Sequence, residues 1–246
     1  ALTDIAGSIF DFRSIDTVSQ GVLIFIFFQS LIIAKKFSMT FYENEKYSKY
    51  LSNLNISLQR FIPKEMLSFL NKQSITEVKL GDHTEEEMTV FFIDIRDFTT
   101  LSEKMTPEDN FKFINSYLRR IGPIIHKNNG FIDKYFGDGI IALFPQKPDD
   151  AIKSALGIRV ELINYNKQRA TYGYMPIKVG MGIHTGKLML GTIGEEIRMD
   201  TTVISDTVNV ASRLESLTKV KGKDLLFSKE TKDRISQIYS DITYSC

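Results

Sequence analysis

The chain has little cysteine, little histidine and almost no net charge, and each shortage excludes a class of protein. Its only cysteine is Cys246, which rules out an internal disulfide framework and favours a reducing compartment. One cysteine and three scattered histidines do not make a Cys/His metal site. A bound metal would need carboxylate ligands, which favour a hard cation such as Mg²⁺ or Mn²⁺. The net charge of +1, without a basic stripe interleaved with aromatic residues, gives no indication of nucleic-acid binding.

Charge is absent altogether from residues 17–34, an apolar run of 18 residues. As a helix the run would be about 27 Å long, close to the roughly 30 Å of hydrocarbon in a bilayer. Aspartates precede it and two lysines follow it, which disfavours a signal peptide and predicts a cytoplasmic C-terminal side. We therefore predict a transmembrane helix over residues 17–36, after an extracytoplasmic remnant at residues 1–16, in a fragment of a larger inner-membrane protein. A buried core helix is the alternative.

Apolar residues at alternating spacings of four and three follow, at Tyr47, Leu51, Leu54, Leu58 and Phe61. This rhythm is typical of a two-stranded coiled coil, and Pro63 is expected to end the helix. We predict a coiled-coil linker helix over residues 37–62 and a connector over residues 63–84. An amphipathic helix packed on its own domain is the alternative. A membrane helix, a pairing helix and a domain in this order would suit a dimer that carries a signal across a membrane.

Helix and strand patterns alternate in the remainder of the chain. Residues 88–95 are an apolar run, predicted to be a buried central strand that ends near Asp94. Thr106 predicts the start of a helix and Gly130 its end. Its expected apolar stripe consists of Phe111, Ile114, Leu118, Ile121 and Ile125.

A second helix is predicted at about residues 149–169, followed by two strands with glycine turns in IKVGMGIHTG and LMLGTIG. We interpret His184 and Thr185 in these strands as hairpin structure. The alternation of helix, strand and hairpin indicates an α+β domain, an α/β sandwich with helices on one face of the sheet.

The stretch DKYFGDGIIALFP, residues 133–145, places Asp133, Lys134 and Asp138 among apolar residues. It predicts a tight β-hairpin with Asp138 at its tip, and period two puts Lys134, Phe136 and Asp138 on one face. If the end of the strand with Asp94 is adjacent, two carboxylates face one point. Their repulsion would raise one pKa unless a divalent cation joined them. Ordinary turn or capping chemistry is the alternative for each aspartate.

The stretch RMDTTVISDTVNVASRLESL, residues 198–217, predicts a helix capped by Asp206. Asn209 and Arg213 are four residues apart and share one face of it. The opposite, core-directed side is expected to carry Val210, Leu214 and Leu217. An asparagine suits the orientation of a sugar, and an arginine suits charge that develops on a phosphoryl group. A solvated helix face is the alternative.

Three motifs, FFIDIRDFTTLSE, IDKYFGDGIIALF and DTVNVASRLE, occur in this order. Together they resemble the class III nucleotidyl cyclase catalytic domain, most closely that of bacterial membrane-anchored adenylate cyclases. The resemblance covers residues 85–246 and implies a ferredoxin-like, palm-like cyclase domain. It also implies a homodimer that converts ATP into 3′,5′-cyclic AMP and pyrophosphate, with two Mg²⁺ or Mn²⁺ ions at each site. The ribose 3′-hydroxyl would attack the α-phosphorus.

The resemblance implies a role for each matching residue. Asp94, Asp138 and the Ile95 carbonyl match the metal ligands. Lys134 and Thr202 match the two base-reading positions, and this pair indicates ATP rather than GTP.

Further along the motifs, Asn209 matches the residue that orients the ribose and Arg213 the residue that stabilises the transition state. Phe98 and Thr99 are implied as further substrate contacts. One subunit would supply the aspartates of a site, and the other would supply Lys134, Thr202, Asn209 and Arg213.

Two departures from the family pattern lie near the base pocket, Thr201 and Ser205. The chain also ends where the family usually continues with further strands, so a lysine that contacts the terminal phosphates is not assigned. Three alternatives are open: a catalytically silent cyclase-like regulatory module, a guanylate cyclase and a diguanylate cyclase. Silent modules usually lose a metal aspartate or the arginine. A diguanylate cyclase would carry Gly-Gly-Asp/Glu-Glu-Phe at the turn, and this chain does not.

Overall fold

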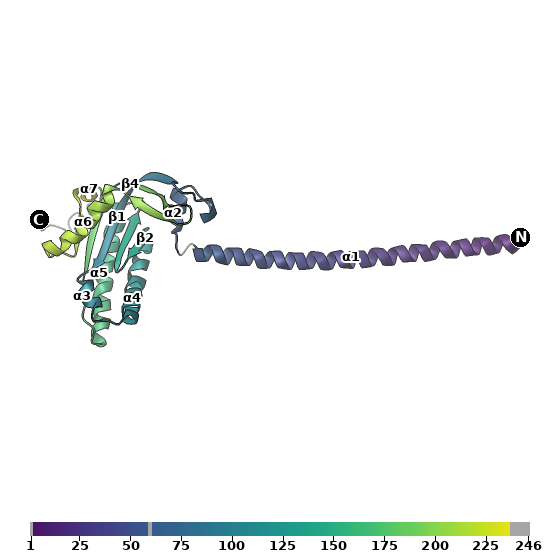
Figure 1. The fold of residues 1–246 in the computed structure, drawn as a ribbon, viewed down its shortest axis with the longest axis horizontal. Helices are drawn as coiled ribbons and strands as arrows, with labels where there is room; N and C mark the ends of the chain where they lie inside the picture. The colour runs from purple at the N-terminus through teal and green to yellow at the C-terminus, as the bar shows by residue number, and fades with distance from the viewer. Residues whose placement is uncertain (1, 59–60, 237–246) are drawn as a thin grey trace. The chain divides into compact units, whose positions relative to one another are not determined.

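The chain divides into two units after Arg60. The structure, a computed structural model, describes residues 2–58 and 61–236, with side chains from Gln20 onward (Figure 1). The last part of the predicted catalytic domain, residues 237–246 with Cys246, lies outside the described residues.

The first unit contains α1 (Leu2–Leu58), in which the segments predicted as membrane helix and as coiled-coil helix form one continuous helix. The helix ends at Leu58, and Pro63 instead precedes the short helix α2 (Lys64–Phe69) as its N-cap. From Gln20 to Leu58, α1 is long and apolar enough to cross a membrane, by length and composition only.

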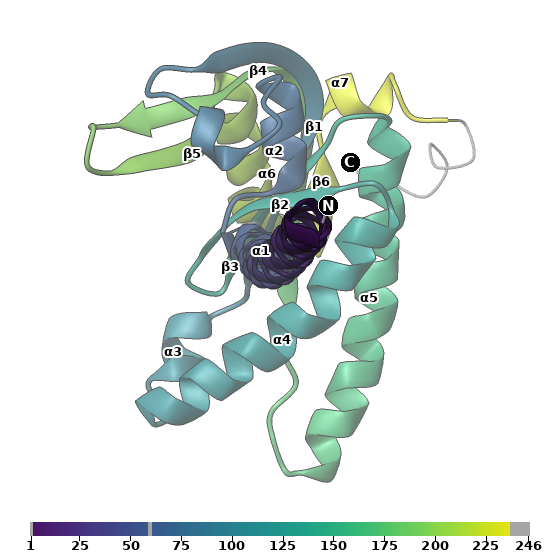
Figure 2. The ribbon, with the colours of Figure 1, turned by 90° about the vertical axis from the view of Figure 1, so that its right-hand side faces the viewer.

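A six-stranded sheet forms the centre of the second unit (Figure 2). Its strands are β1 (His83–Ile95), β2 (Phe131–Phe136), β3 (Gly139–Phe144), β4 (Val179–Gly194), β5 (Met199–Ile204) and β6 (Leu225–Phe227). The order is β2-β3-β1-β4-β5, with every pairing antiparallel, and β6 pairs parallel to β4. The predicted central strand is confirmed in β1, which starts two residues before the predicted domain boundary at Glu85.

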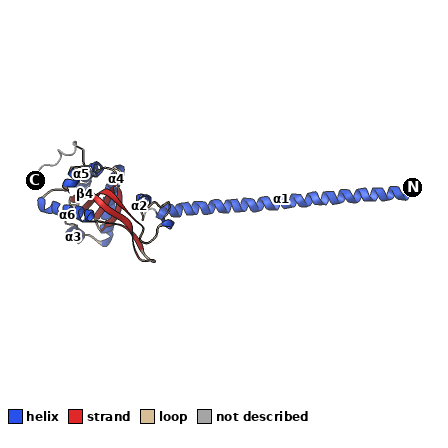
Figure 3. Cartoon of the chain, turned by 90° about the horizontal axis from the view of Figure 1, so that it is seen from above, coloured by secondary structure: helices blue, strands red, loops and turns tan. Residues whose placement is uncertain are grey.

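Helices cover both faces of this sheet, so the prediction that they lie on one face is wrong. One face carries α4 (Pro107–Lys127) and α5 (Pro148–Thr171), while α2 and α6 (Asp206–Lys221) pack on the other. Figure 3 shows the strands between α5 and α6. The short elements are η1 (Ile75–Glu77), α3 (Phe98–Ser102) and α7 (Lys229–Lys232). The central strands are apolar on both sides, and each side needs a cover.

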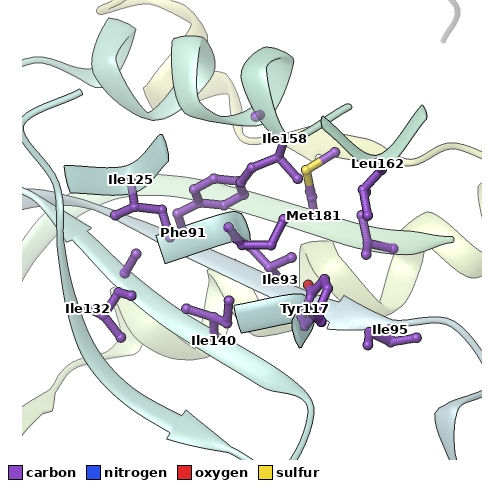
Figure 4. Packing of buried hydrophobic residues seen from close by; sticks show 14 of the residues in the cluster. Phe91, Ile93, Ile95, Tyr117, Ile125, Ile132, Ile140, Ile158, Leu162 and Met181 are labelled. Atoms are coloured by element: carbon purple, nitrogen blue, oxygen red, sulfur yellow. The ribbon is translucent and has the colours of Figure 1, made fainter. Parts of the chain in front are cut away.

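Alternate residues of β1 supply the two apolar cores. Phe91 and Ile93 face α4 and α5, where they pack with Ile125, Ile140 and Tyr117 (Figure 4). Val90 and Phe92 belong to the second core, with α2 and α6. Full burial of one such aliphatic or aromatic side chain contributes roughly 1.5–3 kcal/mol, so the two cores together fix the position of β1.

Helix α4 starts as predicted, and its predicted apolar stripe faces the core except at Phe111: Ile121 and Ile125 are buried, and Ile114 and Leu118 pack against the core. The Thr106 hydroxyl accepts a hydrogen bond from the Asp109 backbone N–H at 3.1 Å, as a capping residue does. The buried side consists of Phe113, Tyr117, Gly122, Ile121 and Ile125, whereas Phe111 is 73% exposed. The predicted stripe is therefore wrong in its first turn. The row that faces the sheet repeats every four residues from Phe113 to Ile125, and Phe111 does not belong to it.

The end of α4 also differs from the prediction. Asn129, at φ 59°, takes the left-handed conformation after the helix, and Gly130 has no positive φ. Gly130 is needed for space, because a Cβ there would lie 2.4 Å from the Phe144 ring.

The two strands predicted from IKVGMGIHTG and LMLGTIG form one 16-residue strand, β4, without glycine turns between them. Gly180, Gly182 and Gly186 instead lie under α6: a Cβ at Gly182 would be 2.3 Å from the Ala211 carbonyl oxygen. The side of α6 that contacts these glycines carries small residues. Its buried residues are Thr207, Ala211 and Thr218, whereas Val210 and Leu214 are only partly buried and Leu217 is 40% exposed, contrary to the prediction.

This close contact predicts that Gly182→Ala will destabilise the domain. The added methyl group would meet backbone atoms of Ala211 and Glu215, which do not move without shifting α6, so we expect a loss of about 1–3 kcal/mol in the free energy of unfolding. Chemical denaturation measures it.

Gly122→Ala in α4 is the matched control. Its Cβ would lie 3.7 Å from the nearest side-chain atom, an ordinary contact, and alanine favours a helix by about 0.5–1 kcal/mol. Equal stability of the Gly182→Ala variant and the unmodified chain would contradict the close helix–strand packing.

Candidate functional site

Two aspartates meet where β1 ends beside the β2–β3 turn. Ile93 pairs with Ile140, so the turn at Gly137-Asp138 lies next to the Asp94-Ile95 end of β1. The Asp138 carboxylate accepts a hydrogen bond from the Ile95 backbone N–H at 3.1 Å. Gly137 takes a φ of 66°, as the first central residue of a type II′ turn does. The predicted hairpin is confirmed, and it brings the Asp94 and Asp138 carboxylates together.

Burial and mutual repulsion act on this pair. Burial is the main cause that raises the pKa of Asp138 to about 7, and the Asp94 carboxylate is the second. The hydroxyl of Tyr117 is buried nearby and has no hydrogen-bond partner among the described residues, and burial together with both aspartates raises its pKa.

The donor set of this pair fits a hard cation. Within the described ranges no cluster of three His, Cys, Asp or Glu forms a metal site. Two carboxylates with the Ile95 carbonyl would supply oxygen ligands only, which suit Mg²⁺ or Mn²⁺ with further positions for water or a phosphate.

The loop after the aspartate is tied to α6. Asp97 takes a left-handed φ of 53° and forms an ion pair with Lys219 at 2.6 Å. Arg96 contacts Glu215 at 3.8 Å and donates to Thr218. The end of β1 is thereby held against the helix.

The two predicted substrate contacts in this loop differ in surroundings. The Phe98 ring stacks on the core residue Phe113, with ring centroids 6.3 Å apart, so its side chain serves packing. Thr99 is exposed.

Lys134 and Thr202 are joined directly: the Lys134 ammonium donates a hydrogen bond to the Thr202 hydroxyl at 2.7 Å. They come from β2 and β5, the two ends of the strand order, so the sheet curves enough to bring its edges together. The sequence pattern placed Asp133 among apolar residues but assigned it no role in the site; its side chain is fully buried 3.6 Å from the Lys134 ammonium. Burial raises the pKa of Asp133 to about 6. A charged residue inside an apolar strand was the signal that could have found it.

The predicted pair on α6 points to solvent. Asn209 and Arg213 are exposed, and across the described part of the chain no hydrogen bond or ion pair engages either side chain. Within the described part of one chain, neither side chain is therefore bonded to Asp94 or Asp138. Ser205, rather than the predicted Asp206, caps α6: its hydroxyl accepts from the Thr207 N–H at 3.0 Å.

Other residues near the motifs have structural contacts. His184 lies within β4, with its ring nitrogen Nδ1 2.7 Å from the Ser228 hydroxyl. Thr185 joins Thr89 at 2.9 Å and Thr231 at 3.0 Å. Both are held in the sheet, although the hairpin expected around them is absent from β4.

Comparison with known proteins gives a consistent family. The family model described as "Adenylate and Guanylate cyclase catalytic domain" matches residues 80–244. An "Adenylate cyclase" of Anabaena cylindrica is 40% identical over 185 residues, which cover 73% of this chain and 37% of that protein. The chain thus spans little more than a third of the length of this relative.

Solved structures agree with these sequence matches. A bacterial light-regulated adenylyl cyclase has a TM-score of 0.68 and 28% identity, over 78% of this chain and 57% of that one. The guanylyl cyclase Cya2 has a TM-score of 0.55 and 31% identity, over 61% of this chain and 78% of that one. The fold is common to proteins named for either base, so base choice depends on particular residues.

The charge repulsion at the aspartate pair predicts the pH dependence of stability. An acid whose pKa is raised on folding stabilises the protein at low pH, and this contribution is lost as pH rises toward about 7. Asp138→Asn cannot ionise, so the variant should not lose stability in this way as pH rises. We expect the metal-free variant to be more stable than the unmodified chain by about 1–2 kcal/mol at pH 8, allowing for solvent screening, and nearly equal at pH 4.

Thermal unfolding with and without Mn²⁺ provides the check. Mn²⁺ should stabilise the unmodified chain at pH 8 and have little effect on Asp138→Asn. A variant that is less stable than the unmodified chain at pH 8, or that gains as much from Mn²⁺, would show that the carboxylates do not form a repelling, cation-binding pair.

Proposed function

Because the chain belongs to the family of adenylate and guanylate cyclase catalytic domains, we propose that it is an adenylate cyclase, which converts ATP into 3′,5′-cyclic AMP and pyrophosphate. The observation that carries this proposal is the direct bond between Lys134 and Thr202, in a domain whose Asp94 and Asp138 also meet. One pair would read the base and the other would hold the metal ions.

Base choice follows from the hydrogen-bonding groups of the first pair. An ammonium only donates hydrogen bonds, so Lys134 suits an acceptor nitrogen on the edge of adenine. Guanine carries an N–H at the corresponding ring position, which would meet a donor with a donor. The Thr202 hydroxyl both donates and accepts hydrogen bonds. It accepts one from Lys134, and its O–H is still able to donate to the base.

Asp94, Asp138 and the Ile95 carbonyl would hold Mg²⁺ or Mn²⁺, two ions at each site. When bound, such ions lower the pKa of the attacking 3′-hydroxyl and stabilise charge on the phosphates. The protein residues contribute orientation: the Ile95 N–H fixes the Asp138 carboxylate, and the ties of Arg96 to α6 fix the loop after Asp94. Arg213 would neutralise charge that develops on the phosphoryl group, and Asn209 would orient the ribose.

The exposure of Asn209 and Arg213 supports sites shared across a homodimer. Neither residue is engaged with the aspartates of its own chain, so each is available to the site of a second copy. The ends of β4 and β5 and the segment between them carry large exposed apolar side chains, namely Ile193, Ile197, Met199 and Ile204. A group of this kind on a soluble domain suits an interface.

We further propose that α1 anchors the protein in the inner membrane, with the catalytic domain in the cytoplasm. The apolar side chains from Val22 to Ile33 are exposed, and Lys35 and Lys36 follow them. A basic flank favours the cytoplasmic side. This arrangement would connect a signal at the membrane to cyclic AMP synthesis.

The direct test is cyclic AMP formation by the purified chain from MgATP or MnATP. We expect activity with ATP, little with GTP, and a loss on the order of 10²-fold or more in Asp138→Asn, the scale for loss of a key electrostatic group. Asp224→Asn, in an exposed ion pair with Arg159, is the matched control and should retain activity. No cyclic AMP from a folded dimer would indicate a silent module, and cyclic GMP in its place a guanylate cyclase.

Membrane attachment gives a separate prediction. A fragment that begins at Lys64 should be soluble, because it lacks the apolar helix, whereas residues 1–246 should sediment with membranes and need detergent. Membrane fractionation followed by size-exclusion chromatography distinguishes the two. A monodisperse, detergent-free preparation of the whole chain would contradict membrane anchoring.

A further inference from the structure

A β-bulge in β2 brings Asp133 to the same side as Lys134. Ile132 pairs with Ala142 and Lys134 with Ile141, so no residue of β3 is opposite Asp133. The extra residue of a bulge interrupts the alternation of side chains along a strand. Two successive charged side chains therefore approach each other, and the carboxylate lies 3.6 Å from the ammonium.

The Asp133 carboxylate is buried without the partners that a buried carboxylate normally has. Its side chain is 0% exposed, and neither oxygen accepts a hydrogen bond in the structure. Lys134 is its ion-pair partner among the described residues. Burial of a charged group without hydrogen bonds lowers stability, so a fold that keeps one invites a functional explanation.

The Lys134 ammonium connects this carboxylate to the proposed base pocket. It has three N–H donors. One is used on the Thr202 hydroxyl at 2.7 Å, and the attraction of Asp133 directs another. The Lys134 side chain is 34% exposed, so the third donor has access to a ligand. A flexible lysine held at two points presents its remaining donor in one direction.

We infer that Asp133 is a positioning residue for base recognition, a buried carboxylate that holds the Lys134 ammonium against Thr202 so that its free donor faces the adenine edge. This inference rests on the proposed adenylate cyclase function. It adds a third residue to the base-reading pair and assigns a purpose to the bulge.

The charges around Asp133 determine how pH acts on this arrangement. Lys134, on the same strand, and Asp200, on β5, are the charged groups that act on it. Burial raises the pKa of Asp133 to about 6, Lys134 opposes this rise and Asp200 adds to it. Below pH 6 the carboxylate is protonated and the ammonium loses its counter-charge, so the preference for adenine should weaken there.

Steady-state kinetics of Asp133→Asn in the full-length protein, with ATP and GTP, test the inference. Asparagine keeps the size of the side chain but removes its charge. We expect KM for ATP to rise on the order of tenfold, kcat to change less than about threefold, and the ATP-over-GTP preference in kcat/KM to fall about tenfold. The thermal midpoint should stay equal or rise, because a buried charge that accepts no hydrogen bond is gone. Asp133→Glu, which restores the charge, should recover part of the preference.

The pH dependence of the same ratio is the second measurement. ATP and GTP share the triphosphate and the metal ions, so the ratio isolates the base. It should fall between pH 7.5 and pH 5.5 in the unmodified chain and stay flat in Asp133→Asn. Asp200→Asn is the matched control: it should keep the preference at pH 7.5 and move the fall to lower pH, because Asp200 raises the pKa of Asp133.

Two results would overturn the inference: an unchanged KM and preference in a folded Asp133→Asn, or a ratio that does not depend on pH in the unmodified chain. The second result decides the matter even where the variant fails to fold. A chain that makes no cyclic nucleotide would refute the proposed function instead. Equilibrium binding of the non-cyclisable α,β-methylene analogues of ATP and GTP then measures the same preference, with the same two outcomes.

Discussion

Burial of β1 on both of its faces is the constraint on which the rest of the domain depends. The strand pairs with β3 on one side and β4 on the other, so its side chains must supply both cores. Because β1 and β3 are antiparallel, the end of one lies beside the beginning of the other. The fold thereby places Asp94 next to the turn that carries Asp138, and the energy that buries β1 also holds two repelling carboxylates together.

The close packing of α6 on β4 is the second determinant of the site. Glycines under the helix let its backbone approach the sheet, and the Arg96 contacts to Glu215 and Thr218 join the helix to the loop after Asp94. Asn209 and Arg213 are left on the outward side. Under the proposed function, each chain would contribute two half-sites, the metal ligands Asp94 and Asp138 to one site, and the base, ribose and phosphate contacts to another.

The sequence was sufficient for features that depend on local pattern, and insufficient for those that depend on packing. The hairpin, the central strand and the start of α4 follow from turn residues, apolar runs and a capping threonine. Glycine is ambiguous, because it serves turns and close contacts equally, so β4 was divided wrongly. No residue of β3 lies opposite Asp133, and this depends on the register between β2 and β3, which no local pattern contains. The capping role of Ser205 was missed because Asp206 beside it is as good a candidate.

Mixed dimers test most directly the claim that each site is built from two chains. An Asp94→Ala chain and an Arg213→Ala chain, each inactive or nearly so alone, are co-expressed, and cyclic AMP is measured against each variant by itself. If the sites are shared, both lesions of a mixed dimer fall in one site and the other site is intact. Random pairing makes about half of the dimers mixed, so the account predicts recovery to roughly a quarter of the unmodified activity under two-fold symmetry. Mixed dimers, confirmed by mass measurement, that stay as inactive as the separate variants would contradict it.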